Sequence, residues 1–282
     1  MRRIEAHQTV IFHHIPKTAG VTFGRIGGRQ YSKGSTFPVV GDKKAAIERF
    51  KSLPPGRRRD YRFIYVHQAA KLIDEVESPV LVTMFREPVA RVLSLYYYAR
   101  RKPRHPLHDV SSRYAMEKFF ELRMDRKWPE FTDGQFSSIA CIMESKSLGG
   151  FSRTRSAERL KDILRKQVVF GLLERFDESL LLIKETLGWK KPVYYTRMNI
   201  NPAPRENPYP KWVVEHIRDR NKKDVELYEF AEKEFARRVG SKEPGFARQL
   251  KRFRRRNRTI GSLYAHIDWF TRRLTGVRGQ SG

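Results

Sequence analysis

Cysteine is almost missing from this sequence of 282 residues, because Cys141 is the only one. A single cysteine excludes an intrachain disulfide and also excludes a metal site built from cysteines. One free thiol is compatible with a reducing compartment, where structural disulfides are rare.

Long hydrophobic runs are missing as well. No stretch approaches the roughly 18–20 apolar residues that a membrane-spanning helix needs. The apolar run after Arg2 and Arg3 is too short and too interrupted for the hydrophobic region of a signal peptide. We therefore expect a cytoplasmic protein, with a peripheral place at the inner membrane face left open.

Acidic residues are few relative to basic ones. The chain has 58 Lys plus Arg against 31 Asp plus Glu, a formal net charge of +27. The electrostatic field of so positive a protein attracts polyanions, whether nucleic acid, anionic lipid, acidic polysaccharide or a phosphorylated cofactor. The charge alone does not indicate which of these is the ligand. With 39% hydrophobic and 12% aromatic residues, the composition is that of a globular protein of one large domain or two small ones.

Short apolar segments bounded by turn residues predict four strands, at residues 9–14, 61–66, 80–85 and 168–172. Apolar residues at helical spacing predict helices at residues 88–100, 112–126, 132–144, 157–166, 176–187 and 213–239. Alternating strands and helices favour an α/β fold with a mainly parallel sheet covered on both faces. Residues 194–210, rich in proline and asparagine, predict a long irregular loop. In such a sheet, ligands bind beyond the carboxyl ends of the strands.

The first predicted strand leads into Ile15-Pro16-Lys17-Thr18-Ala19-Gly20-Val21-Thr22-Phe23. A strand, a tight turn of small residues and a helix start make a phosphate cradle, in which backbone N–H groups and the helix dipole attract the anion. Lys17 adds a full positive charge, and Thr18 and Thr22 add hydroxyl donors. The Walker A pattern is absent. An ordinary strand–turn–helix junction with a surface lysine has the same appearance.

Two more strand ends carry chemistry-bearing side chains. Arg86 follows the third predicted strand, where a fixed guanidinium can contact phosphate through two donors. Ser94 lies eight residues further on, on the next helix, and its hydroxyl can serve the same anion. His67 ends the second strand and can take a proton from a hydroxyl nucleophile near neutral pH. Each of the three alone also fits a purely structural role.

Together these segments resemble the membrane-associated carbohydrate sulfotransferase family, which includes heparan sulfate 2-O-sulfotransferases and related bacterial enzymes. FHHIPKTAGVTF is similar to that family's 5′-phosphosulfate loop, and VTMFREPVARVLSLYYY to its 3′-phosphate segment, with the same Arg86-to-Ser94 spacing. IYVHQA stands at the place of the family's strand-end histidine. The resemblance covers roughly residues 7–239. Val21, Val66 and Glu87 depart from the pattern, which usually has a hydroxyl residue, a glycine and an aspartate there.

The resemblance implies a P-loop-like three-layer α/β fold with a central, mainly parallel sheet flanked by helices. It implies an enzyme that binds PAPS (3′-phosphoadenosine-5′-phosphosulfate), needs no metal and releases 3′,5′-ADP. The implied catalytic residues are Lys17, which stabilises charge on the leaving phosphate, and His67, which deprotonates a carbohydrate or glycolipid acceptor. Arg86 and Ser94 would hold the 3′-phosphate. The implied contacts of the phosphosulfate are Lys17, Thr18, Ala19, Gly20, Val21 and Thr22.

A change in composition divides the chain into an expected sulfotransferase domain, residues 1–240, and a basic tail, residues 241–282. Within the tail an apolar stripe at helical spacing predicts an amphipathic helix, formed by Ile260, Leu263, Tyr264, Ile267, Phe270 and Leu274. The basic run RFRRRNR precedes it. Such a helix can lie on an anionic membrane, capture an acidic acceptor, or pack on the domain.

Two other functions are compatible with parts of the sequence. A P-loop nucleotide kinase would need a Walker-type loop and magnesium ligands, and neither is visible. A nucleic-acid-binding protein would explain the charge of +27 but has no recognisable binding motif here. It would also leave the Lys17 loop unexplained, so we expect no specific nucleic acid partner.

Overall fold

The computed structural model describes residues 8–38, 43–123, 128, 130–148, 157–196, 209–242 and 244–274, with side chains of the last helix described to residue 260. Within these ranges the centre of the molecule is a five-stranded parallel sheet in the order β2-β3-β1-β4-β5. Its strands are β1 (Thr9–His13), β2 (Thr36–Pro38), β3 (Phe63–Val66), β4 (Pro79–Phe85) and β5 (Val168–Leu172). All five residues are buried both in β1, the central strand, and in β5, an edge strand, as expected of a parallel sheet with helices on both faces.

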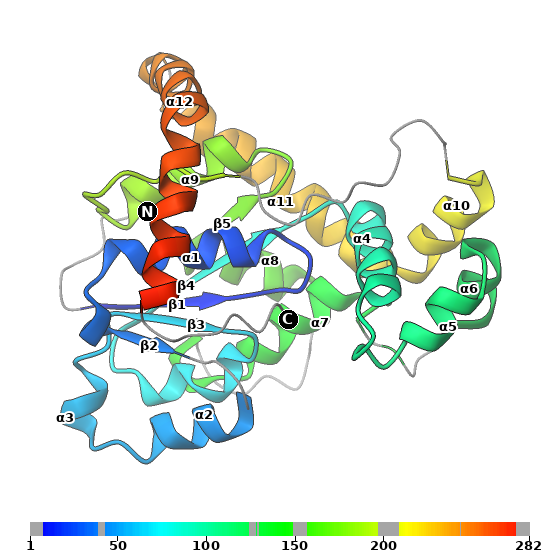
Figure 1. Ribbon diagram of the computed structural model, residues 1–282, viewed down its shortest axis with the longest axis horizontal. Helices are drawn as coiled ribbons and strands as arrows, with labels where there is room; N and C mark the ends of the chain where they lie inside the picture. The colour runs from blue at the N-terminus through cyan, green and yellow to red at the C-terminus, as the bar shows by residue number, and fades with distance from the viewer. Residues whose placement is uncertain are drawn as a thin grey trace.

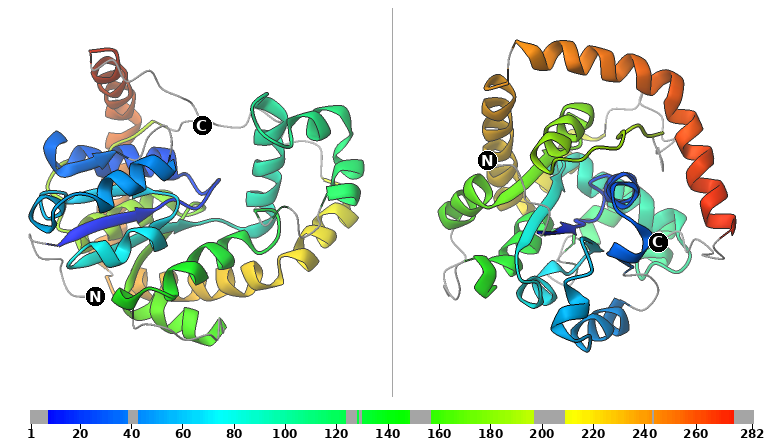
Figure 2. Two further views of the ribbon diagram at one scale, coloured as in Figure 1. Left: turned by 90° about the horizontal axis from the view of Figure 1, so that it is seen from below. Right: turned by 90° about the vertical axis from the view of Figure 1, so that its left-hand side faces the viewer.

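Helices cover both faces of the sheet, so the fold has three layers (Figures 1 and 2). One face carries α1 (Gly20–Gln30) and α9 (Phe176–Thr186), and the opposite face carries α7 (Gly134–Met143), α8 (Ala157–Lys166) and α11 (Lys222–Gly240). Close packing marks the first face, because a Cβ on Gly27 of α1 would lie 2.5 Å from the ring of Phe63. On the second face, Ser138 of α7 reaches the ring of His13. The expected three-layer α/β fold is confirmed.

A helical lobe extends beyond the edge of this core (Figure 1). It consists of α4 (Pro88–Arg101), α5 (His108–Arg113), α6 (Met116–Arg123) and α10 (Lys211–Arg220). The lobe has its own apolar core, centred on Val92, Tyr96, Phe119, Phe120, Phe131, Val213 and Ile217. Because α4 starts directly after β4 and belongs to the lobe, it places lobe residues beside the carboxyl ends of the strands.

The four predicted strands are confirmed to within two residues. Sequence inspection missed the edge strand β2 and two short helices, α2 (Lys43–Lys51) and α3 (Pro55–Arg58). The helix predicted at residues 112–126 is wrong in its bounds, because α5 and α6 replace its described part. The backbone of Tyr114 is extended between them. Of the irregular loop predicted at residues 194–210, residues 197–208 lie outside the described part of the chain.

The single helix predicted at residues 213–239 is also wrong, because α10 and α11 meet at Asn221. The Asn221 side chain donates hydrogen bonds to the carbonyl oxygens of Phe131, at 3.0 Å, and Ile217, at 2.8 Å. It thereby competes with helical bonding, as asparagine side chains commonly do. The break allows α10 to join the lobe while α11 remains on the sheet.

The predicted helix in the tail lies within α12 (Gly245–Leu274). Its first half packs on the core: Phe246 and Phe253 are buried, and Arg254 pairs with Asp177 of α9 at 3.0 Å. Of the predicted apolar stripe, every side chain after Ile260 lies outside the described residues. Among the described residues, no helix has the length and apolar character needed to cross a membrane.

Candidate active site

The sheet topology places the candidate site between β1 and β4. From β1 the chain passes through α1, on one face, toward the β2–β3 side of the sheet. From β4 it passes through α7 and α8, on the other face, to β5. The two connections leave in opposite directions, so β1 and β4 flank a topological switch point. Open α/β sheets bind their ligands in the crevice at such a point.

The backbone of the Lys17 loop suits an anion. Lys17 and Ala19 adopt left-handed backbone angles, φ 70 and 65 degrees, in the kind of turn whose N–H groups form an anion-binding concavity. Ala19 is the N-cap of α1 and supplies no capping side chain, and the first turn of α1 has no acidic residue. The first N–H groups of a helix have no partner within it, so this end attracts negative charge.

Histidine packing fixes where α1 begins. A Cβ on Gly20 would lie 1.7 Å from Cδ2 of His14, so only glycine allows the imidazole to lie against the start of the helix. The Tyr65 hydroxyl lies 2.5 Å from Nδ1 of His14 and holds that ring. The predicted contacts Ala19, Gly20 and half-buried Val21 therefore lie in a tightly packed turn.

The two threonines of the loop are more enclosed than the sequence suggests. Thr18 is fully buried, and its hydroxyl donates to the carbonyl oxygen of Ile15 at 2.9 Å. In this structure the Thr18 hydroxyl therefore stabilises the turn instead of offering its proton to a ligand. Thr22 is 8% exposed and lies in the first turn of α1.

The Lys17 side chain extends toward α4. Its Nζ lies 4.1 Å from the centre of the Tyr98 ring, a cation–π contact. Burial, followed by the charges of Arg101, Arg86 and Lys102, lowers the pKa of Lys17 to about 8. These three cations repel the charged amine of Lys17, so the region has an excess of positive charge. A polyanionic ligand bound there would reduce that repulsion. Ser94 precedes Tyr98 by one helical turn and therefore lies on the same side of α4.

Arg86 connects the loops that follow β4 and β1. Its Nη1 donates to the carbonyl oxygen of Lys17 at 3.1 Å. Its own backbone is held by Gln135 of α7: the Arg86 N–H donates to Oε1 at 2.9 Å, and the Arg86 carbonyl accepts from Nε2 at 2.8 Å. The structure thus brings together the two segments that the sequence predicts to bind phosphate.

His67 lies at the end of β3, next to the Lys17 loop. Its Nδ1 is 2.9 Å from the carbonyl oxygen of His14, and the two imidazole centres are 4.2 Å apart. A carbonyl oxygen can only accept, so Nδ1 carries the proton and Nε2 is the basic nitrogen of the neutral ring. That tautomer suits a general base.

His13 differs from His67. Burial, together with the charge of His67, lowers the pKa of His13 to about 3. Its Nε2 lies 2.7 Å from the Ser138 hydroxyl. His13 therefore stays neutral near physiological pH and forms part of the support for the site.

Sequence reasoning missed three residues of this arrangement: His14, Tyr98 and Gln135. The histidine pair at 13–14 and the tyrosine triplet at 96–98 are visible in the sequence, but neither shows which member faces the loop. No sequence signal marks Gln135. Within the described part of the chain, no group of three or more His, Cys, Asp or Glu side chains is arranged to hold a metal ion.

Comparison with known proteins adds little to this geometry. No family model matches the chain, and no curated protein matches it. A search of solved structures returns a crystal structure of mouse sulfotransferase SULT7A1 complexed with PAP. The two chains are 15% identical, the match covers 89% of this chain and 90% of the other, and the TM-score is 0.42. An overlap this weak does not identify a ligand, so the function proposed next depends on the site residues.

Proposed function

We propose that this protein is a sulfotransferase that moves the sulfuryl group of PAPS to a hydroxyl of a carbohydrate acceptor. The observation that carries the proposal is the contact between two anion-binding segments at the switch point of the sheet, where Arg86 donates to the Lys17 carbonyl. PAPS has two separate anionic groups, a 5′-phosphosulfate and a 3′-phosphate. The two segments offer one cationic position for each.

The Lys17 loop suits the 5′-phosphosulfate. The uncapped N-terminus of α1 offers backbone donors to the phosphate oxygens, and Lys17 adds a positive charge. Arg86 and Ser94 suit the 3′-phosphate, because a guanidinium binds phosphate through paired donors. The 3′-phosphate is absent from ATP, so this pair would distinguish the two nucleotides.

The proposed reaction is an in-line displacement at sulfur. The acceptor oxygen forms a bond to sulfur while the bond from sulfur to the 5′-phosphate oxygen breaks, and the acceptor proton passes to Nε2 of His67. Negative charge develops on the departing phosphate, where Lys17 and the loop amides stabilise it. The products are a sulfate ester and 3′,5′-ADP.

The carbohydrate acceptor is the part of the proposal that rests on the sequence resemblance. Incubating the protein with labelled PAPS and a panel of cell-derived glycans, glycolipids, small alcohols and phenols, followed by mass spectrometry of the products, tests it. Label on a glycan hydroxyl would support a carbohydrate acceptor. Label found only on small non-carbohydrate alcohols or on phenols would contradict it.

Replacing Arg86 with alanine should weaken 3′,5′-ADP binding by about 1.5–3 kcal/mol, the range for a charge-assisted hydrogen bond. Binding of 5′-AMP, which lacks the 3′-phosphate, should change much less. Titration calorimetry with both nucleotides measures the two effects. Equal losses for the two ligands would show that Arg86 supports the fold and does not read the 3′-phosphate.

The affinity for 3′,5′-ADP should fall as the pH rises above about 8. The pKa of Lys17 in the free protein is lowered to about 8, so below that pH its amine is already charged before the nucleotide binds. Above it, binding must be accompanied by proton uptake, because the nucleotide favours the charged amine. The phosphates are close to fully ionised above pH 8, because their second pKa is about 6. Calorimetry between pH 7 and 9.5 measures the decline, and the Lys17→Arg variant, charged at every pH tested, should show none. A decline of the same size in that variant would exclude Lys17 as its source.

A further inference from the structure

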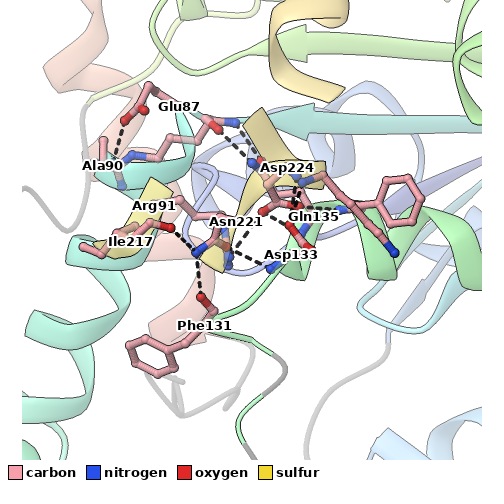
Figure 3. Close-up of polar contacts among 12 residues, drawn as sticks. Glu87, Ala90, Arg91, Phe131, Asp133, Gln135, Ile217, Asn221 and Asp224 are labelled. Atoms are coloured by element: carbon pink, nitrogen blue, oxygen red, sulfur yellow. Dashed lines mark hydrogen bonds and ion pairs between the residues drawn. The ribbon is translucent and has the colours of Figure 1, made fainter. Parts of the chain in front are cut away.

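A buried polar network joins α4, α7 and α11 (Figure 3), and through Gln135 it holds the backbone of Arg86 at the end of β4. Gln135, which is 1% exposed, uses both atoms of its side-chain amide on the N–H and the carbonyl of Arg86. Both backbone groups of one residue are thus fixed by one side chain. These two hydrogen bonds set the direction in which the chain leaves β4.

Gln135 is itself fixed from α11. The Asp224 carboxylate, which is fully buried, accepts from the backbone N–H of Gln135 at 3.1 Å and of Phe136 at 2.7 Å. A carboxylate in this position caps the start of α7. Arg91 of α4, 1% exposed, pairs with Asp224 at 3.5 Å.

The capping is reciprocal. Asp133, the N-cap of α7, accepts from the backbone N–H groups of Lys223 and Asp224 at 3.0 and 3.1 Å, so it caps α11. Asn221 in turn accepts from the Asp133 N–H at 2.9 Å. Each helix therefore holds the start of the other, and Gln135 lies in the first turn of a helix that cannot shift alone.

We propose that Gln135 is a positioning residue for nucleotide specificity: by clamping the Arg86 backbone, it places the guanidinium that reads the 3′-phosphate. This inference rests on the proposed function. It assigns Gln135 no contact with the nucleotide. Asp224 and Arg91 support Gln135, because their contacts fix the backbone of α7 while the side-chain amide of Gln135 bonds to Arg86.

The chain provides a matched control, a second side chain that bonds both backbone groups of a strand-end residue but holds no phosphate-binding residue. Ser179 of α9 is fully buried. It bonds both backbone groups of Leu172, at the end of β5: the Leu172 N–H donates to its hydroxyl oxygen at 2.8 Å, and the hydroxyl donates to the Leu172 carbonyl at 3.0 Å. The arrangement repeats the Gln135 clamp on the neighbouring strand, where no phosphate-binding residue follows. Ser179→Ala should thus lower stability without changing specificity.

The test compares the affinities of 3′,5′-ADP and 5′-AMP by calorimetry in the full-length chain. Gln135→Met keeps the length of the side chain and removes both bonds. We expect its preference for 3′,5′-ADP over 5′-AMP to fall about tenfold, the effect of weakening one charge-assisted contact. Gln135→Glu keeps an acceptor for the Arg86 N–H and loses the donor when ionised, so it should fall between wild type and Gln135→Met. If the methionine variant does not fold, the nucleotide preference of Gln135→Glu still tests the proposal.

Four results separate the possible failures. Equal weakening of both nucleotides in the Gln135 variants would overturn the positioning role, and so would an equal loss of preference in Ser179→Ala. Wild-type protein that does not prefer 3′,5′-ADP would overturn the proposed function itself. A wild-type preference that survives in both Gln135 variants would overturn only the inference.

Discussion

Replacing His67 with alanine should slow sulfuryl transfer by about 10²–10⁴-fold, the usual contribution of a general base, while leaving the affinity for 3′,5′-ADP nearly unchanged. The reason is the tautomer: Nδ1 is committed to the His14 carbonyl at 2.9 Å, so Nε2 is the nitrogen that can accept the acceptor's proton. Initial rates with saturating PAPS, together with calorimetry for 3′,5′-ADP, measure the two quantities.

His108 provides a matched control for this substitution. Its Nδ1 also lies near a backbone carbonyl, that of Ala99 at 3.2 Å, but on α5, in the lobe. His108→Ala should therefore leave the rate of transfer close to that of the wild type. An active His67→Ala enzyme would place the base on another residue, with Glu144 or another carboxylate to be examined.

Lys17→Ala should lower turnover by about 10²–10³-fold, as the loss of one donor that stabilises developing negative charge does in other enzymes. The fold should survive. Position 17 has a left-handed backbone, φ 70 degrees, that strains alanine and lysine alike. The cation–π contact that is lost with Tyr98 is worth on the order of 1 kcal/mol. Turnover at saturating PAPS and the thermal unfolding temperature test the two parts.

Lys102 is the control for Lys17, because its Nζ lies 6.0 Å from the centre of the same Tyr98 ring. Lys102→Ala removes a neighbouring charge without removing the residue of the phosphate loop, so its effect on turnover should be much smaller. Near-normal turnover in Lys17→Ala, or equal losses in the two variants, would be incompatible with a role of Lys17 at the leaving group.

Much of the fold could be predicted because its signals are local. The buried strands β1, β4 and β5 are short apolar runs bounded by turn residues, and their positions follow from the sequence alone. The short edge strand β2 has no such run. The break at Asn221 could not be foreseen, because it depends on a bond to the Phe131 carbonyl, about ninety residues earlier in the chain.

In the candidate site, too, some residues could be predicted from local sequence and others depend on distant contacts. Lys17, Arg86 and His67 follow predicted strands, and a parallel sheet places their loops at the same edge, beyond the carboxyl ends of the strands. The residues that hold them come from distant helices. Gln135 reaches Arg86 only once α7 has packed on the sheet, and Tyr98 receives Lys17 only once the lobe has packed beside it. Periodicity and spacing carry no information about such contacts.

The measurement that tests the central claim most directly is the preference of the unmodified protein among anionic ligands. Thermal unfolding in the presence of equal concentrations of 3′,5′-ADP, ATP and duplex DNA compares them in one experiment, because at equal concentration the ligand that binds the folded state more tightly stabilises it more. A PAPS-dependent sulfotransferase should be stabilised most by 3′,5′-ADP, and the Arg86→Ala variant should lose that advantage. Equal or greater stabilisation by ATP or by DNA would contradict the assignment.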